Sequence, residues 1–121
     1  MDVRLNPDCV RDVMIFIEEN LEYGGLIDQF KIVNGLSDKY SEVDLLYSTE
    51  QLIMRGWLIA VNTSGIIIGG IHPNGHDFLA NTRAQGIWGK VRSKLKEKGI
   101  EAAIEIMGKL AWKITEAELG L

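Results

Sequence analysis

Two histidines lie four residues apart in the segment HPNGHDFLANTRAQGIW, which runs from His72 to Trp88. On a helix, this spacing would place both imidazoles on one face, where Asp77 would serve as a third ligand for zinc. The segment lacks the glutamate of the HExxH motif, and Pro73 places His72 at a helix boundary. We therefore expect His72 to cap a helix and His76 to lie at a partly buried helix position. We expect no metal site and no cofactor.

The other motifs that could carry catalysis are incomplete. The glycines in GGIHPNG match neither the dinucleotide-binding GxGxxG pattern nor the phosphate-binding GxxxxGK[ST] loop. Ser64 lacks the GxSxG context of a nucleophilic serine and falls at an expected hairpin tip. The single cysteine, Cys9, has no disulfide partner and no CxxC companion, so we interpret it as a small residue near a helix start. The sequence therefore predicts a protein that is not an enzyme.

Length and charge limit the classes of protein that remain. A chain of 121 residues, of which 46% are hydrophobic, predicts one domain over residues 1–121. Its apolar runs are too short for a membrane helix and its first residues do not resemble a signal peptide, so we expect a cytoplasmic protein without a membrane partner. The net charge of −4 is unevenly placed: residues 1–50 carry eleven acids and four bases, whereas residues 83–98 carry six bases and one acid. One short basic segment thus lies in an acidic protein.

The first half of the chain predicts helices separated by turns. Asn6 and Pro7 form a helix start, and apolar residues follow at helical spacing, which predicts a helix over residues 7–22. The polar and apolar alternation of residues 29–32 predicts a short strand or extended segment. Ser41 followed by Asp44 resembles a capped start and predicts a helix that continues to Gly56.

The helix expected over residues 41–56 has two stripes at helical spacing. The apolar stripe, which we expect to be buried, contains Leu46, Tyr47, Ile53 and Met54. The opposite stripe, which we expect to point outward, contains Asp44, Ser48, Gln51 and Arg55.

A hairpin and further helices follow. Residues 57–61 and 65–71 form apolar, β-branched runs separated by the turn-forming residues 62–65, which predicts a β-hairpin. Pro73 opens a helix that we expect Gly86 to break. The next helix has an apolar stripe at Trp88, Val91 and Leu95 and a basic stripe at Lys90, Lys94 and Lys98. A last helix reaches towards residue 118, and its apolar face contains Ile100, Ile104, Met107, Ala111 and Ile114.

This order of elements predicts an α+β, mainly helical protein. Helix, extended segment, helix, hairpin and helix is the order of a winged helix-turn-helix domain, in which the hairpin is the wing. We expect the winged-helix core to span about residues 7–83 and a C-terminal helical extension to span about residues 84–121.

Two runs, YSEVDLLYSTEQLIMRGWLIAV and GIHPNGHDFLANTRAQGIWGKVRSKL, carry a resemblance to a known family. They resemble a family of small proteins of unknown function from bacteria and their phages. Its members show a helix ending in a Leu-x-x-x-Gly-Leu-like turn, then a threonine-led GH-D/E-FL segment, then a Trp and lysines. The matching positions, over about half the chain, are Leu52, Gly56, Gly75, His76, Asp77, Phe78, Leu79, Trp88 and Lys90.

This chain departs from the family pattern at two positions. Ser48 stands where the family often has a histidine after Tyr47, and His72 stands where a capping threonine is usual. The resemblance implies a winged helix and an association with phages. It supplies no catalytic residue, and the GHDFL segment is interpreted as a helix-packing element.

The first functional hypothesis is a DNA-binding or transcription-related regulator. In this hypothesis Ser48, Gln51 and Arg55 face a groove, the tip at residues 62–65 is the wing, and Lys90, Lys94 and Lys98 contact phosphates. Its weakness is charge, because residues 41–56 contain three acids and one base whereas affinity for DNA depends on cations.

The alternative hypothesis is a protein–protein interaction module that acts on a host or phage protein without contacting DNA. The acidic first half of the chain favours this alternative. We further expect a homodimer formed through the last helix, at Ile100, Ile104, Met107, Ala111 and Ile114, unless that face folds back on the core.

Overall fold

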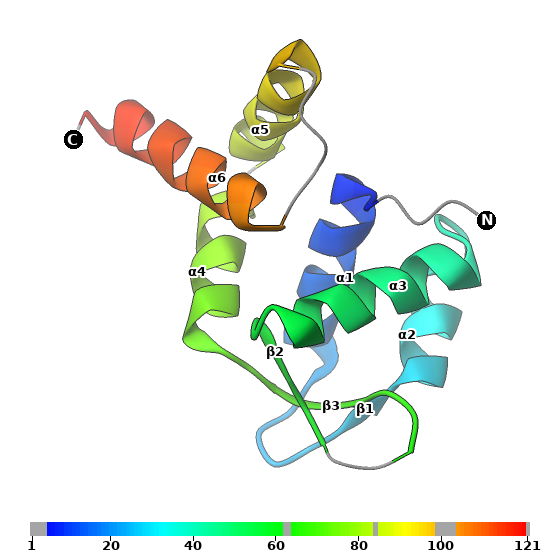
Figure 1. Cartoon of the computed structure of the whole chain (residues 1–121). Helices are drawn as coiled ribbons and strands as arrows, with labels where there is room; N and C mark the ends of the chain where they lie inside the picture. The colour runs from blue at the N-terminus through cyan, green and yellow to red at the C-terminus, as the bar shows by residue number, and fades with distance from the viewer. Residues whose placement is uncertain (1–4, 62–63, 84, 99–103, 121) are drawn as a thin grey trace.

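The computed structural model of the chain describes residues 5–61, 64–83, 85–98 and 104–120. Within these ranges, the fold has six helices and a small antiparallel sheet that lies along one side of them (Figure 1). The helices are α1 (Pro7–Asn20), α2 (Gln29–Leu36), α3 (Glu42–Met54), α4 (Pro73–Thr82), α5 (Gln85–Lys98) and α6 (Ile104–Leu119). The strands are β1 (Ile27–Asp28), β2 (Leu58–Ala60) and β3 (Ile67–Ile71). The expected mainly helical α+β class is confirmed.

The starts of α1 and α3 are fixed by side chains that the sequence identifies. The Asn6 side chain accepts hydrogen bonds from the backbone N–H groups of Asp8 and Cys9, at 3.0 and 3.3 Å. The Ser41 hydroxyl accepts one from the backbone of Asp44, at 3.2 Å. Each bond satisfies a donor that a helix start would otherwise leave unpaired. Both predicted helix starts are confirmed.

The extended segment predicted at residues 29–32 is wrong, because these residues form the first turn of α2. The Asp28 carboxylate accepts a hydrogen bond of 2.9 Å from the backbone N–H of Lys31 and caps this helix. Ile32 and Leu36, four residues apart, are buried on one helix face. The extended element lies just before the helix, at β1.

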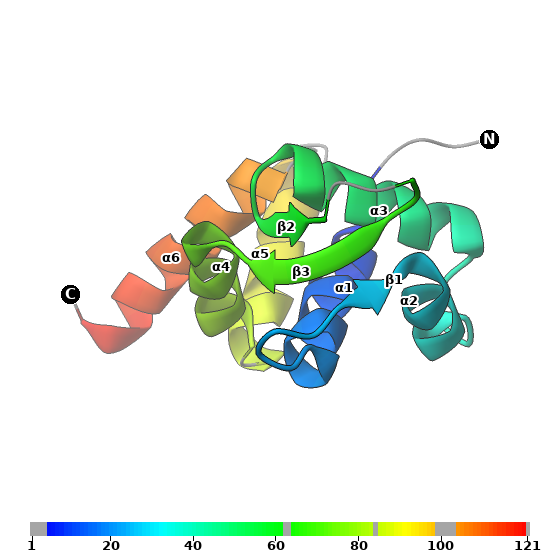
Figure 2. The same ribbon diagram turned by 90° about the horizontal axis from the view of Figure 1, so that it is seen from below.

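The sheet has the strand order β1–β3–β2, with both pairs antiparallel. Strands β2 and β3 form the predicted hairpin, with Leu58 opposite Ile71 and a bulge between Ile59 and Ala60. Strand β1 joins the other edge of β3 by pairing Ile27 with Ile68. Figure 2 shows the sheet in front of α1 and α5, so one sheet face is packed on helices and the other looks away from them.

The buried apolar side chains that the structure describes form one cluster, with residues from every helix and strand. At its centre, Phe78 contacts Trp57 and Trp88 at ring-centroid distances of 4.8 and 6.3 Å. The predicted apolar stripe of α5 is confirmed, because Trp88, Val91 and Leu95 are all buried. Helix α6 packs against α1, α4 and α5. The C-terminal helices therefore share the core of the preceding elements.

The GHDFL segment at residues 75–79 packs α4 onto this core. A Cβ at Gly75 would lie 2.6 Å from the Trp57 carbonyl oxygen and 2.8 Å from a side-chain carbon of Ile71, so no larger residue fits. Phe78 and Leu79 are buried. The predicted packing role is confirmed for these positions, whereas His76 is exposed. Helix α4 ends at Thr82 and α5 begins at Gln85, so Gly86 belongs to the first turn of α5 and the predicted break at Gly86 is wrong.

A buried arginine joins α1 to the end of α4. Arg11 donates from Nε to the Thr82 carbonyl at 2.8 Å and from Nη2 to the Arg83 carbonyl at 2.9 Å. Its guanidinium carbon lies 5.5 Å from the Trp88 ring centroid, within the range of a cation–π contact. Burial lowers the pKa of Arg11, and nearby carboxylates oppose this shift. Arg11 therefore donates hydrogen bonds to two carbonyls at the end of α4 that have no donor within the helix.

Candidate functional site

Neither histidine side chain has the environment that the sequence predicts. His72 occupies the N-cap position of α4, but its side chain makes no capping hydrogen bond, so the predicted cap is wrong at the level of the side chain. His76 is exposed rather than partly buried. Within the described residues, no group of three or more His, Cys, Asp or Glu side chains has a geometry that could hold a metal ion.

The outward stripe predicted on α3 is wrong at Ser48. This residue is 1% exposed, and the buried face of α3 consists of Leu45, Ser48, Thr49 and Leu52. The neighbouring Thr49 is buried at low cost because its hydroxyl donates to the Leu45 carbonyl at 2.7 Å. Because Ser48 is buried, its side chain is unable to reach a DNA groove in this structure.

The remaining α3 residues of the predicted DNA contact differ in exposure. Gln51 is half-buried and its amide lies 3.9 Å from the sulfur of Met54, whereas Arg55 is exposed at the C-cap. The expected burial of Met54 is wrong, because this side chain is 77% exposed. Leu46, Tyr47 and Ile53 are half-buried. The accessible surface of α3 thus combines apolar side chains with the carboxylates of Glu42 and Glu50.

The basic stripe of α5 is exposed at Lys90 and Lys94, as expected. Lys90 pairs with Glu118 of α6, and Lys94 lies 3.8 Å from Glu97. The neighbouring Arg92 lies 3.4 Å from Asp8 of α1. The side chain of Lys98 lies outside the described residues. Each of these ion pairs reduces the positive field that the segment would present to a phosphate backbone.

The apolar face of α6 is covered by the chain itself at its centre. Met107 and Ala111 are completely buried, and Ile114 is half-buried. Ile100 and the side chain of Ile104 lie outside the described residues. Met107 and Ala111 therefore pack into the core of one chain, which is the alternative to a subunit interface at these two residues. The homodimer expected from the sequence stays a prediction, and the burial of these two residues favours a face that folds back on the core.

Cys9 lies in the core at the start of α1. Its side chain is completely buried, and its sulfur lies 3.6 Å from the Asp44 carbonyl oxygen. Burial raises the pKa of the thiol to about 11, and a hydrogen bond with Ser48 opposes the shift. The thiol is therefore protonated near neutral pH and is a poor nucleophile. This agrees with its interpretation as a small packing residue.

The outer face of the sheet, which no sequence pattern singled out, carries exposed apolar side chains. Leu26, Ile59 and Val61 are all exposed. A Cβ at Gly69 would lie 3.2 Å from a Val61 methyl carbon and 3.5 Å from a Leu26 methyl carbon, which places both side chains over the middle of β3. We call Leu26, Ile59, Val61 and Gly69 the outer sheet patch. An exposed apolar patch of this kind is typical of an interaction surface.

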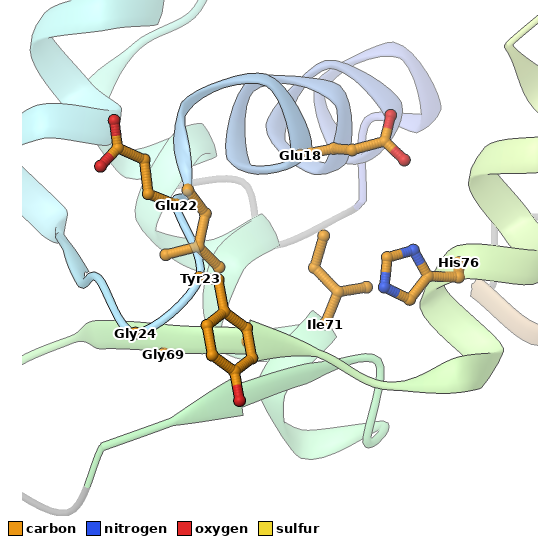
Figure 3. Close-up of a pocket in the computed structure, with 9 residues that line it drawn as sticks. Glu18, Glu22, Tyr23, Gly24, Gly69, Ile71 and His76 are labelled. Carbon is orange, nitrogen blue, oxygen red and sulfur yellow. The ribbon is translucent and has the colours of Figure 1, made fainter.

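A pocket of about 270 Å³ adjoins this patch. The end of α1, the following loop, strand β3 and helix α4 surround it, and its lining residues are Glu18, Leu21, Glu22, Tyr23, Gly24, Gly69, Gly70, Ile71 and His76. Figure 3 shows Glu18 and His76 at one end, Tyr23 at the other side, and Ile71 between His76 and Tyr23. Gly69 belongs to both the pocket and the outer sheet patch, so the two surfaces are continuous.

Charge around the pocket is mainly negative. Arg83 pairs with Glu18 and lies 3.8 Å from Glu19. The Glu22 carboxylate has no ion pair with another described residue and points away from Glu18 (Figure 3). Arg83 thus lies close to two of the three carboxylates near the end of α1, and Glu22 adds a negative charge that no described cation pairs with. No spacing rule could predict this pocket, because its walls come from segments that are far apart in the sequence.

No described helix combines the length and the apolar composition needed to cross a membrane.

Comparison with known proteins identifies a family without assigning a function. No curated protein and no solved structure matches the chain. The family model described as "Hypothetical protein (DUF2513)" matches residues 4–101, which is most of the chain and includes the outer sheet patch and the pocket. The chain therefore belongs to the DUF2513 family of hypothetical proteins.

Proposed function

We propose that this protein is a winged-helix module that binds a protein partner, and that the outer sheet patch is its main contact surface. The element order α1–β1–α2–α3–β2–β3 and the strand order β1–β3–β2 support the winged-helix topology, with the β2–β3 hairpin as the wing. A host or phage regulator is the partner class that the family resemblance suggests. The fold alone does not determine the ligand, so the accessible side chains decide between candidates.

The exposed apolar side chains around Gly69 are the observation that carries this proposal. Leu26 and Val61 are apolar, lie on one sheet face and meet over a position without a side chain. Solvent-exposed apolar groups of this size gain free energy when a partner covers them. A phosphate backbone would gain nothing from such a surface, because its affinity comes from cations.

DNA binding is a second candidate, and the exposed Lys90 and Lys94 on α5 favour it. Two features weigh against it. Ser48 is buried, and the accessible part of α3 carries Glu42 and Glu50. A helix with this charge would be repelled by phosphates in the major groove.

A selection from a random peptide display library tests the protein-binding proposal. We expect the wild-type protein to enrich peptides that bind reversibly, and Val61→Glu to abolish their binding because it places a charge in the outer sheet patch. The matched control is Val43→Glu, since Val43 is also an exposed valine but lies on α3. Circular dichroism tests whether both variants are folded.

Fluorescence anisotropy with a labelled duplex of mixed sequence tests the second candidate. We expect DNA affinity no tighter than the nonspecific range of about 10⁻⁴ to 10⁻⁶ M at physiological salt. Tight binding that weakens steeply with salt, and that is lost when Lys90, Lys94 and Lys98 are changed to Gln, would instead establish DNA binding.

Peptide binding that is lost in Val43→Glu but kept in Val61→Glu would assign the contact to α3 and reject the outer sheet patch.

A further inference from the structure

We infer that the pocket beside the outer sheet patch receives an arginine side chain of the partner protein, while apolar residues next to that arginine cover Leu26 and Val61. This inference rests on the proposed protein-binding function and names the group that the pocket would recognise. Its basis is the shape of the pocket, the charge of its rim and its continuity with the apolar surface.

The size of the pocket suits a side chain. Its volume of about 270 Å³ is below the range of about 300–1,000 Å³ that is typical of sites for drug-sized ligands. Leu21 and Ile71 supply apolar surface, and Gly69 and Gly70 leave this part of β3 without side chains. A long side chain with an apolar stem fits such a lining better than a compact polar molecule.

The charge around the pocket selects a cation. Glu18 and Glu22 line the pocket and Glu19 lies beside them on α1; among the described residues, Arg83 pairs with Glu18 and Glu19 but not with Glu22. The pairing of Arg83 with Glu18 shows that a guanidinium is accommodated beside this rim. The remaining negative charge favours a second cation at the pocket mouth.

The aromatic ring of Tyr23 favours the planar guanidinium of arginine over a compact cation. Tyr23 is fully exposed in the loop after α1, where it lines the pocket (Figure 3). A guanidinium stacks on such a ring while its N–H groups remain available to carboxylates. His76, at the opposite end of the pocket, offers a ring nitrogen that accepts a hydrogen bond when the imidazole is neutral.

The test is a titration of the full chain with N-acetyl-arginine methylamide, followed by amide chemical shifts in NMR spectra. We expect saturable shifts at Gly69, Gly70 and Ile71. The neutral analogue N-acetyl-citrulline methylamide should bind roughly fivefold more weakly, because it lacks the charge needed for the carboxylate and cation–π interactions. N-acetyl-glutamate methylamide should cause no shifts at these residues.

Two aromatic variants make the test specific to the pocket. Tyr23→Ala removes an exposed ring that supports no core residue, and should weaken the arginine probe several-fold. Phe30→Ala is the matched control, because Phe30 is also exposed but does not line the pocket. Equal binding of the arginine and citrulline probes, or unchanged affinity in Tyr23→Ala, would overturn the inference.

The peptides from the display selection separate this inference from the proposed function. Selected peptides that bind through the outer sheet patch, but tolerate replacement of each arginine by citrulline, would reject the arginine pocket and leave the protein-binding function standing. Arginine-probe shifts at the pocket without any peptide that responds to Val61→Glu would reject the proposed function and leave a site for a cationic side chain. Loss of both results would reject both proposals.

Discussion

The indole nitrogen of Trp88 donates a hydrogen bond of 2.8 Å to the carboxylate of Asp8, which joins α5 to the first turn of α1. The second oxygen of the same carboxylate lies 3.4 Å from Arg92. One acidic side chain thus fixes a buried ring and an exposed cation of the same helix. These two contacts differ in their degree of burial, and so should differ in their contribution to stability.

Asp8→Ala should lower the free energy of unfolding by about 1–3 kcal/mol, because the buried Trp88 donor would lose a charged acceptor. Arg92→Gln should cost less than about 1 kcal/mol, since it removes only an exposed ion pair. Urea denaturation followed by tryptophan fluorescence measures both. Equal losses would show that the exposed pair, rather than the indole bond, carries the contribution of Asp8.

Arg11→Leu should destabilise the protein by about 3–5 kcal/mol, because it leaves the carbonyls of Thr82 and Arg83 without their donor. Arg11→Lys should recover only part of this loss, since one ammonium lacks the planar fork that reaches both carbonyls. Chemical denaturation gives the two values, and hydrogen exchange at the end of α4 locates the effect. Full recovery by lysine would contradict the role assigned to the fork.

Glycine-to-alanine substitutions should have opposite effects in α4 and α5. Gly75→Ala should cost more than about 3 kcal/mol, because the new Cβ would lie 2.6 Å from the Trp57 carbonyl oxygen. Gly89→Ala should stabilise the protein by about 0.5–1 kcal/mol, because nothing lies within 4 Å of the added atom and alanine favours the helix. Thermal denaturation compares them. Stabilisation by both would mean that α4 is displaced from Trp57.

The apolar face of α6 should act in folding rather than in dimer formation. Met107→Glu should unfold or strongly destabilise the chain, because Met107 is 0% exposed. Trp112→Glu should be tolerated, because Trp112 is 48% exposed. Sedimentation equilibrium should give the monomer mass for the wild type at micromolar concentration. A wild-type dimer that Trp112→Glu dissociates would instead place a subunit interface on the exposed side of α6.

Alkaline pH should destabilise the fold through Cys9. Burial raises its pKa from 9.0 to about 11, so the folded state retains a proton that the unfolded chain releases. This contribution is present below pH 9 and is lost as the pH rises through about 11. Burial also raises the pKa of Tyr40, which donates a 2.6 Å hydrogen bond to Asp12. Tyr40 therefore also contributes stability that is lost as the pH rises.

Denaturant titrations at pH 8 and at pH 10.5 measure this effect. Cys9→Ala should reduce the difference between the two pH values, and Tyr40→Phe should do so independently. Iodoacetamide at pH 8 should modify native Cys9 far more slowly than the urea-unfolded chain. Rapid modification of the native protein would show that the thiol is accessible and that its pKa is not raised by burial.

The parts of the fold that could be predicted are those with local signals. Caps such as Asn6 and Ser41 mark helix starts because they bond to backbone groups two or three residues away. The stripe at Trp88, Val91 and Leu95 predicted the buried face of α5 because all three members are apolar. In these elements the local preference and the global packing agree.

One prediction error arises because the polarity of a residue does not show whether that residue is buried. Ser48 and Thr49 are polar in the sequence but lie on the inner face of α3, since small hydroxyls can bond within the helix or to close neighbours. In α2, a four-residue alternation was too short to distinguish a strand from the start of a capped helix. The burial of Ser48 is decided by distant parts of the chain, whereas the α2 error missed the local cap formed by Asp28.

The candidate site could not be predicted for a related reason. Tyr23, Gly69 and His76 belong to a loop, a strand and a helix, and only the packing of α4 beside β3 brings them together. Their spacing in the sequence carries no information about this. The outer sheet patch similarly depends on β1 joining β3, which places Leu26 beside Val61.

The strand order β1–β3–β2 has a consequence for the sequence of events in folding. Strands β2 and β3 are neighbours in the chain and close a short loop, whereas β1 must wait for two intervening helices before it can reach β3. Closing the longer loop costs more chain entropy, so this pairing is the non-local step that slows folding. Because Leu26 adjoins β1, the apolar surface over Gly69 is complete only when that step has occurred. A newly made chain therefore completes the outer sheet patch only after the β2–β3 hairpin has formed.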